Sequence, residues 1–392
     1  MKFVYGFIAT LVLSTFSFGS CNKSPAQNSG NTVTQKVFYN WNDFAMGADL
    51  SYVNQVQDYG GFYKDSGSVK DPFNMVKNHG ANIVRVRLWH NPQWLAPLNS
   101  GKLYSDLYDV VKTIQRAKSA GMAVSLDLHY SDTWADPDHQ AIPAAWAGLS
   151  LPVLKDSVYN YTLSVLNYLK SRSLVPEMIQ VGNENNQGML WPLGKTNGSN
   201  FSAFCDLLKS GIKAVRDFSA TSSIKPQIIL HVAQLQNADS WTANVITAGG
   251  ITDFDVIGLS HYSKWSTVNS MTGIKNTISR LKTTYGKKVM IVEVAYPFTT
   301  MNADSYTNII SADAMVPGYA ISKDGQYQYM KDLTQAVISG GGTGIMYWEP
   351  AWITSTLHDL WGTGSSWENC AFFDFQNNAL PVMEYMTYPY KF

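Results

Sequence analysis

The sequence predicts an α/β fold of the (β/α)8 TIM-barrel class, built as a single domain with long loops after its strands. Eight short apolar runs follow one another along the chain, and each ends in polar or aromatic residues. Stretches with helical spacing separate most of these runs. Strands that alternate with helices pair in parallel, and eight such units close a barrel. A chain of 392 residues with 45% hydrophobic and 15% charged residues can bury a core of this size.

The apolar runs are the expected strands. They cover Phe44–Tyr52, Ile83–Trp89, Met122–Tyr130, Met178–Asn185, Gln227–Val232, Phe254–Tyr262, Val289–Ala295 and Gly344–Glu349. Helices are expected over Ser105–Ala120, Asp156–Ser171, Phe201–Phe218, Ile274–Tyr285 and Gly325–Ser339. A further helix is expected to begin at Asp71-Pro72 and to end at His79-Gly80, because these pairs are typical of helix starts and ends.

Two of the loops after strands are predicted to be unusually long. They run from Ser131 to about Leu154 and from Trp352 to Asp374. Long loops without structure of their own are often functional, and on a barrel the loops that follow the strands form the active face. Both loops should therefore border the site.

The charge balance argues against nucleic acid as a partner. Lys and Arg together number 29, as do Asp and Glu, so no basic field is available to attract phosphates. Aromatic residues make up 13% of the chain, and several Trp follow predicted strands. Most Trp residues pack in cores, but Trp at several strand ends favours stacking on sugar rings.

The N-terminus is typical of a secretory signal. Met1-Lys2 precedes an apolar stretch from Phe3 to Phe18, and Gly19-Ser20-Cys21 follows it. This ending resembles a bacterial lipoprotein cleavage site. We therefore expect residues 1–20 to be a signal peptide, residues 21–36 a flexible tether lipidated at Cys21, and residues 37–392 the catalytic domain. Such a protein would lie at the cell surface or in the periplasm. The alternative is an ordinary secretory signal with Cys21 removed.

The other two cysteines, Cys205 and Cys370, are too few for a disulfide scaffold or a zinc cluster. Two buried thiols are expected. One bridge between them is the alternative.

Two glutamates at strand ends carry the expected chemistry. Glu184 ends the fourth predicted strand and Glu293 interrupts the seventh, where a buried carboxylate is costly unless it is paired or used. The fourth and seventh strands face each other across a barrel mouth. Two facing carboxyl groups are what glycoside hydrolysis needs, with retention when they lie about 5–5.5 Å apart and inversion when the gap is wider.

A family resemblance extends this interpretation. Asn183-Glu184 together with Glu293 resembles the retaining clan A of glycoside hydrolases. Arg85–Pro92, His129–Pro137, Pro143–Trp146 and Val181–Glu184 resemble family 53, the endo-β-1,4-galactanases, and the resemblance extends from about Phe44 to the C-terminus. It implies that Glu184 is the acid/base, that Glu293 is the nucleophile, and that Asn183 holds the sugar 2-hydroxyl. It also implies a galactan substrate, no organic cofactor and, we expect, a monomer.

The substrate-binding candidates are mostly polar or aromatic residues at the strand ends. They are Asp49, Arg87, Trp89, His129, Asp132, Trp134, Asn183, His261, Tyr262 and Trp348. Arg87 is expected to fix an ionised Glu293, or else to form a structural ion pair. Asp132 and Asp136 bind hydroxyls or cap turns. By resemblance, Tyr262 contacts the nucleophile and Trp348 is a sugar platform. His129 and His261 have a structural alternative.

A loop after the seventh strand suggests a calcium site. Asn302, Asp304, Tyr306 and Asn308 place oxygen atoms at alternate positions, as in loops that wrap Ca²⁺. Bacterial members of the resembled family carry a calcium loop here, with further ligands that would fall on Ser365 and Glu368. Asn302 and Tyr306 depart from that pattern. The alternative is a polar loop without an ion.

Three readings of the function compete. The leading one is a retaining endo-hydrolase of β-1,4-galactan. Another clan A enzyme that acts on xylan, mannan or glucan is the second. The third is a non-catalytic glycan-binding lipoprotein, against which the presence of both glutamates argues.

Overall fold

The strands close into a parallel barrel of eight in this computed structural model, which describes residues 35–196 and 201–392. The order around the barrel is β1-β10-β9-β8-β7-β6-β5-β4. The strands are β1 Ala45–Asp49, β4 Ile83–Leu88, β5 Ala123–Leu128, β6 Met178–Val181, β7 Gln227–Ala233, β8 Val256–His261, β9 Lys288–Val294 and β10 Gly344–Tyr347. Each lies inside or within a residue of a predicted run, so the predicted barrel is confirmed.

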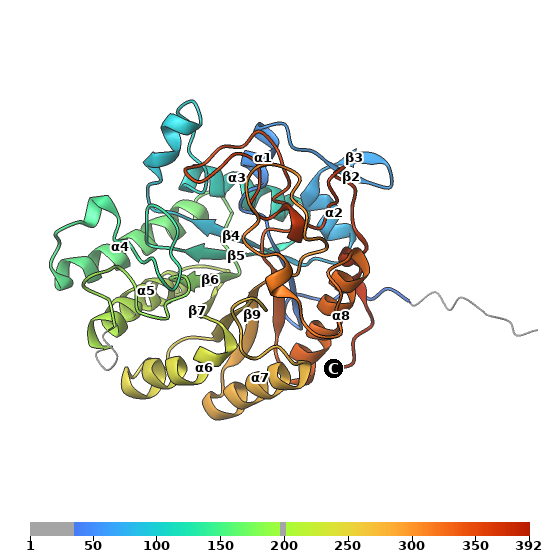
Figure 1. Ribbon diagram of the computed structural model, residues 1–392. Helices are drawn as coiled ribbons and strands as arrows, with labels where there is room; N and C mark the ends of the chain where they lie inside the picture. Colours follow the sequence, from blue (N-terminus) through green and yellow to red (C-terminus); the bar gives the residue numbers. More distant parts are fainter. Residues whose placement is uncertain (1–34, 197–200) are drawn as a thin grey trace, which may run out of the picture. The chain divides into compact units, whose positions relative to one another are not determined.

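Helices lie outside the strands (Figure 1). They are α1 Val53–Asp58, α2 Pro72–Asn78, α3 Leu107–Ser119, α4 Leu151–Lys170, α5 Ser202–Ala220, α6 Leu235–Thr242, α7 Met271–Tyr285 and α8 Lys323–Ser339. A π-helical turn, Ala243–Ala248, continues α6, and short 3-10 turns cover Gln93–Leu98, Ala144–Trp146, Ala312–Ala314, Glu368–Cys370 and Pro381–Thr387. The sequence did not predict α1, α6 or the hairpin of β2 Tyr63–Asp65 and β3 Ser68–Lys70.

The start of α2 shows the predicted capping. The Asp71 side chain accepts hydrogen bonds from the backbone N–H groups of Phe73 and Asn74, and Pro72 occupies the first turn. The predicted loop up to Leu154 is shorter than expected, because α4 already begins at Leu151. None of the described helices is both long enough and apolar enough to cross a membrane.

An apolar layer fills the inside of the barrel near the start of the strands. It consists of Ala45, Ile83, Ala123, Met178, Ile229, Val256, Met290, Val292 and Met346, with at least one residue from every barrel strand. Because side chains alternate along a strand, every second residue beyond this layer also faces inward. The next inward-facing positions, nearer the C-terminal ends of the strands, therefore carry the polar residues of the barrel interior.

Loops after the strands cover the C-terminal mouth. The two long loops predicted after β5 and β10 are present, and the connections after β6 and β9 are also long. Cys205 and Cys370 are buried free thiols, so the alternative of a bridge between them is wrong. The predicted signal peptide, Cys21 and most of the tether lie outside the described residues.

Candidate active site

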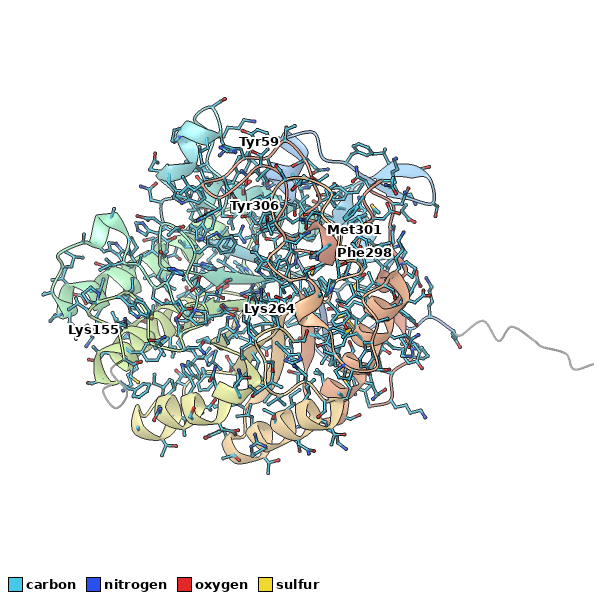
Figure 2. All side chains as sticks on the ribbon, in the orientation of Figure 1. Tyr59, Lys155, Lys264, Phe298, Met301 and Tyr306 are labelled. Carbon is cyan, nitrogen blue, oxygen red and sulfur yellow. The ribbon has the colours of Figure 1, made fainter. Side chains whose placement is uncertain are left out.

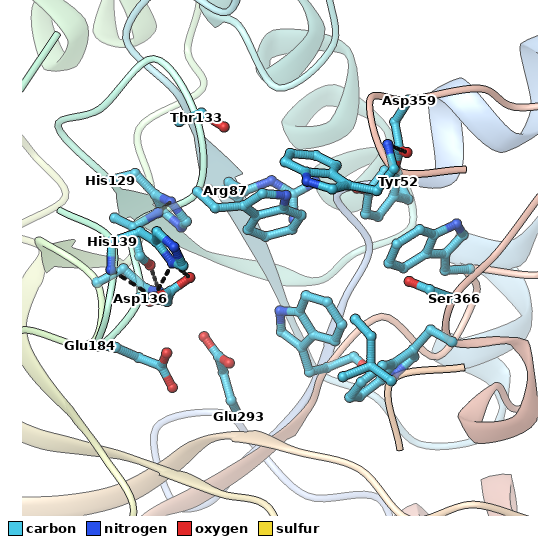
Figure 3. A pocket seen from close by; sticks show the side chains of 18 of the residues that line it. Tyr52, Arg87, His129, Thr133, Asp136, His139, Glu184, Glu293, Asp359 and Ser366 are labelled. Carbon is cyan, nitrogen blue, oxygen red and sulfur yellow. Dashed lines mark hydrogen bonds and ion pairs between the residues drawn. The ribbon is translucent and has the colours of Figure 1, made fainter. Parts of the chain in front are cut away.

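A cavity of about 580 Å³ opens at the C-terminal mouth of the barrel. Glu184 and Glu293 lie at its floor and point toward each other, with indole rings on the opposite side (Figure 3). The Trp residues in its wall are Trp134, Trp265, Trp348, Trp352, Trp361 and Trp367. Trp265 and Trp361 are 44% and 55% exposed, so the rim offers flat apolar faces to a ligand.

The two glutamates lie close enough to act on one bond. A carboxylate oxygen of Glu184 lies within 4.8 Å of one of Glu293. Glu184 follows β6 in a left-handed backbone conformation, with φ at +44°, which is uncommon for a residue with a side chain. Both side chains are more than nine-tenths buried. The spacing matches the separation of about 5–5.5 Å that accompanies retention rather than the wider inverting gap.

An irregularity in β9 brings Glu293 into the barrel. Leu259 pairs with Ile291, but the next residue on β8, Ser260, pairs with Glu293, so Val292 and Glu293 together face one residue of the neighbouring strand. Val292 belongs to the inner apolar layer, and simple alternation would turn Glu293 outward. The β-bulge restores the inward direction of the carboxylate.

Glu293 is held by two donors. The Arg85 Nη2 lies 2.8 Å from its Oε1, and the Tyr262 hydroxyl donates to its Oε2 at 2.8 Å. Burial raises the pKa of Glu293 to about 7, while the charge of Arg85 and the Tyr262 hydrogen bond pull this pKa down. Both partners stabilise the ionised form, as a nucleophile requires.

Glu184 has no such ion pair within residues 35–196 and 201–392. Burial and the nearby charge of Glu293 raise the pKa of Glu184 well above its usual value, and a 2.5 Å hydrogen bond from the Ser260 hydroxyl opposes this rise. When two buried carboxyl groups share one site, the proton stays on the one without a cation beside it. Glu184 is therefore the acid of the pair.

Arg87 was expected either to fix Glu293 or to form a structural ion pair, and the structure shows the ion pair. Arg85 holds Glu293 in its place. Arg87 instead pairs with the buried Glu349 at 3.2 Å, and its guanidinium lies 4.3 Å from the ring centroid of Trp134. Ile83 on β4 belongs to the inner apolar layer, and Arg85 and Arg87 follow it at intervals of two, so both arginines face inward. Arg87 lies one step nearer the mouth, where it contributes to the cavity wall.

The structure brings six of the ten predicted substrate-binding residues to the cavity wall. These are Arg87, His129, Trp134, Asn183, Tyr262 and Trp348. Asn183 is more constrained than expected. Its Oδ1 accepts from Arg85 at 2.9 Å, and its Nδ2 donates to the Ala135 carbonyl at 2.8 Å.

The other four do not line the cavity, which corrects their expected role. Asp49 is fully buried below it and accepts from Arg85. His261 points outward from β8 to the Tyr329 hydroxyl, because alternation turns it away from the barrel interior. Trp89 packs against the Trp94 ring. Asp132 accepts hydrogen bonds from the backbone N–H groups of Asn91 and Ala144, so the turn-capping alternative describes it.

Several residues of the site were not anticipated. They are Arg85, Asp127, Gln180, His231 and Ser260, all of which face the barrel interior. His231 interrupts an apolar strand just as Glu293 does, and the same reasoning would have found it. Ser260 could not have been found in this way, because a single uncharged serine within a strand is common and does not indicate a functional site.

The group of Glu184, His231 and Glu293 does not suit a metal ion, although one ligand atom from each lies within 4.8 Å of the others. Glu293 already pairs with the cation Arg85, which would repel a metal. Both His231 nitrogens lie within hydrogen-bond distance of protein groups.

The predicted calcium ligands lie where the loops after β9 and β10 meet, in the region of Tyr306 (Figure 2). Asp304 accepts hydrogen bonds from the backbone of Tyr306 and Ser365 at 2.8 and 2.9 Å. The Ser365 hydroxyl donates to the Trp352 carbonyl, and the Tyr306 hydroxyl donates to Asp359. These three residues are thus already engaged by the protein.

Two residues of this cluster have free ligand atoms. Asn308 Nδ2 donates to Asn302 Oδ1 at 2.7 Å and to Glu368 Oε1 at 3.0 Å. Asn308 Oδ1 and Glu368 Oε2 are buried and have no hydrogen-bond partner among the described residues. Burial and the charge of Asp304 raise the pKa of Glu368 to about 7. Asn308 and Glu368 fit a hard cation, because each has a buried oxygen without a donor.

The barrel and its paired carboxyl groups define a glycoside hydrolase. The model of the family described as Glycosyl hydrolase family 53 matches residues 45–386. An arabinogalactan endo-β-1,4-galactanase of Cellvibrio japonicus is 44% identical over 89% of this chain and 92% of its own. The chain belongs to glycoside hydrolase family 53.

Other relatives agree with this assignment. An endo-β-1,4-galactanase of Bacillus subtilis is 31% identical over 88% of this chain and 86% of its own. The solved family 53 catalytic domain of Ignisphaera aggregans superposes with a TM-score of 0.81 at 34% identity, covering 92% of this chain and 99% of that one. A solved fungal β-1,4-galactanase gives a TM-score of 0.73 at 30% identity, covering 88% and 99%.

Arg85 is predicted to set the acidic limb of the pH profile. In Arg85→Lys the charge remains, but the fork that reaches Glu293, Asp49 and Asp127 is lost. We expect the pKa of Glu293 to rise, so the acidic limb of kcat/KM moves to higher pH and the plateau falls about 10²-fold. Arg87→Lys on the same strand is the matched control, and its acidic limb should stay in place. Equal shifts in the two variants would contradict the assignment.

Proposed function

We propose that this protein is a retaining endo-β-1,4-galactanase that cleaves the galactan backbone of type I arabinogalactan. The observation that carries the proposal is the pair of carboxyl groups of Glu184 and Glu293, within 4.8 Å of each other in a family 53 barrel. The relatives named as arabinogalactan endo-β-1,4-galactanases support the choice of substrate.

The reaction proceeds in two displacements. In the first, the ionised Glu293 attacks the anomeric carbon while Glu184 donates its proton to the departing glycosidic oxygen, which leaves a glycosyl ester on Glu293. In the second, Glu184 takes a proton from water, and this water displaces Glu293. Two inversions give net retention. Both steps use side chains and water, and we propose no organic cofactor.

The shape of the cavity supports internal cleavage of a chain. Trp265 and Trp361 are both part of its wall and both are about half exposed at the rim. Trp134 and Trp348 lie deeper and are only partly exposed. Aromatic faces within the cavity and at its rim suit several sugar units of one chain rather than a single terminal unit.

Product analysis on unbranched β-1,4-galactan tests this function. We expect a rapid fall in chain length, oligosaccharide products and, by proton NMR, first products of β configuration. Glu184→Gln and Glu293→Gln should keep the fold, as judged by circular dichroism, and should lose activity by orders of magnitude. Xylan, mannan and β-glucan run in parallel test the other clan A activities. Preferred cleavage of one of these would replace the galactan assignment. Galactan binding with no products would favour the non-catalytic alternative.

We further propose that Asn308 and Glu368 bind a structural Ca²⁺. Their two buried oxygens without partners support this, as does the raised pKa of Glu368, since a cation would supply the missing counter-charge.

Removal of calcium tests the site. We expect a chelator to lower the melting temperature and added Ca²⁺, but not Mg²⁺, to restore it, because saturation at 100 times Kd stabilises the fold by about 2.7 kcal/mol. Glu368→Gln should abolish the response. Asp313→Asn, an exposed acid in the loop after β9, is the control and should retain the response. A melting temperature unaffected by chelator would contradict the proposed site and favour the alternative of a polar loop without an ion.

We also propose that the protein is a monomeric lipoprotein anchored through Cys21 at the cell surface or in the periplasm. The apolar N-terminal stretch that ends in Gly19-Ser20-Cys21 supports the lipid anchor. Metabolic acyl labelling should mark the expressed protein, and Cys21→Ser should prevent it. Labelling that fails to reach Cys21 would favour an ordinary secretory signal.

A further inference from the structure

A closed set of hydrogen bonds begins and ends on Glu184. Its backbone N–H donates to His231 Nδ1 at 3.3 Å, His231 Nε2 lies 2.8 Å from Ser260 Oγ, and the Ser260 hydroxyl lies 2.5 Å from Glu184 Oε1. His231 on β7 and Ser260 on β8 are fully buried. Glu184 follows β6, and the other two residues lie on the next two strands around the barrel, so the backbone fixes their spacing.

The direction of each bond follows from the first one. A backbone N–H can only donate, so Nδ1 of His231 is an acceptor. Burial and the neighbouring Arg85 hold the pKa of His231 well below its usual value, so the ring is neutral and its single proton lies on Nε2. Nε2 therefore donates to Ser260, and the Ser260 proton is left to point at Glu184 Oε1.

The surroundings of Nδ1 are mixed. Asn183 Oδ1 lies 2.9 Å from it and favours the opposite tautomer. Gln180 Nε2 lies 3.1 Å from it, but this amide has two hydrogens and shorter contacts to Asp127 Oδ1 at 2.6 Å and to Asn183 Oδ1. Asn183 Oδ1 also accepts from Arg85 Nη2 at 2.9 Å and from Gln180 Nε2 at 2.9 Å. Either of these donors can serve that oxygen without the histidine ring. Among the described residues, Nδ1 is the one acceptor within hydrogen-bond distance of the Glu184 backbone N–H, so this N–H decides the tautomer.

We propose that His231 and Ser260 are positioning residues that keep Oε1 of Glu184 an acceptor, so that the catalytic proton is carried by Oε2. Among the described residues no donor is within hydrogen-bond distance of Oε2, and the side chain borders the cavity. Oε2 is then the oxygen that gives its proton to the leaving group and later takes one from water. Ser260 donates to Oε1 in both ionisation states, so no rearrangement separates the two displacements.

The proposal rests on the proposed function only for the acid/base role of Glu184. The other titratable or charged groups that face Glu184 are Glu293 on β9, Asp136 in the loop after β5, Arg85 on β4 and Tyr262 beyond β8. None of them donates a hydrogen bond to the Glu184 carboxyl group within the described part of the chain. Ser260 is thus the group whose removal acts directly on Oε1.

Kinetic profiles of serine variants test the role of Ser260. In Ser260→Ala the hydrogen bond to the ionised form is lost, so we expect the pKa of Glu184 to rise, the basic limb of kcat/KM to move to higher pH and kcat to fall roughly tenfold or more with KM little changed. Ser260→Thr keeps the hydroxyl and should restore both.

A matched serine separates this role from a general packing effect. Ser263→Ala removes another buried hydroxyl close to β8, which donates to the Ala314 carbonyl at 2.6 Å. Its pH profile should match that of the unaltered protein. A lower kcat in Ser260→Ala with an unshifted basic limb would overturn the proposal.

NMR of ¹⁵N-histidine-labelled protein tests the hydrogen-bond direction without any substrate. The ring signals of His231, identified by their absence in His231→Gln, should show a proton on Nε2 and a bare Nδ1 across neutral pH. A proton on Nδ1, or a charged ring, would overturn the proposal even if galactan is cleaved. The expected tautomer in a protein that does not cleave galactan would overturn only the proposed function.

Discussion

The buried guanidinium of Arg85 is the interaction on which the rest of the site depends. It contacts Asp49 on β1, Asp127 on β5 and Glu293 on β9, and it also reaches Asn183 beyond β6. Carboxylates in such a dry place would otherwise take up protons, because burial disfavours the charged form. Against the effect of burial, the charge of Arg85 lowers the pKa of Asp127, and it opposes the rise that burial causes in the pKa of Glu293. Its contacts also join strands from different parts of the barrel wall. The nucleophile is therefore held by the same group that holds the barrel mouth together.

Each of the two glutamates accepts a hydrogen bond from the same stretch of chain, at and just beyond the end of β8. Ser260 on β8 and Tyr262 just beyond it both face the barrel interior, and His261 between them faces the helix layer. Ser260 donates to Glu184, and Tyr262 donates to Glu293. The distinction between acid and nucleophile thus comes from Arg85, which favours one carboxylate, and not from a difference in burial. Both glutamates are almost equally shielded from solvent.

The sequence predicted the barrel and both glutamates because apolar runs and buried charges leave a clear local signal. It failed where the answer depends on neighbours in space. Arg85 and Arg87 lie two residues apart on β4, so their side chains point to the same side of the strand. Which carboxylate each one pairs with depends on where Glu293 and Glu349 lie in the barrel. His261 was misjudged because its orientation follows from alternation counted from the inner apolar layer, which the sequence alone does not mark. Asp132 looked like a ligand because a turn cap and a sugar-binding acid are the same residue type.

The β-bulge at Val292 and Glu293 has a consequence for how relatives of this protein are judged. The orientation of the nucleophile depends on one additional residue in β9, not only on the presence of a glutamate. A related chain that lost this residue would keep both glutamates in its alignment, yet its seventh-strand carboxylate would face the helices. Such a chain would be a pseudoenzyme with an intact motif. In this barrel the direction of the nucleophile depends on strand geometry as well as on residue identity.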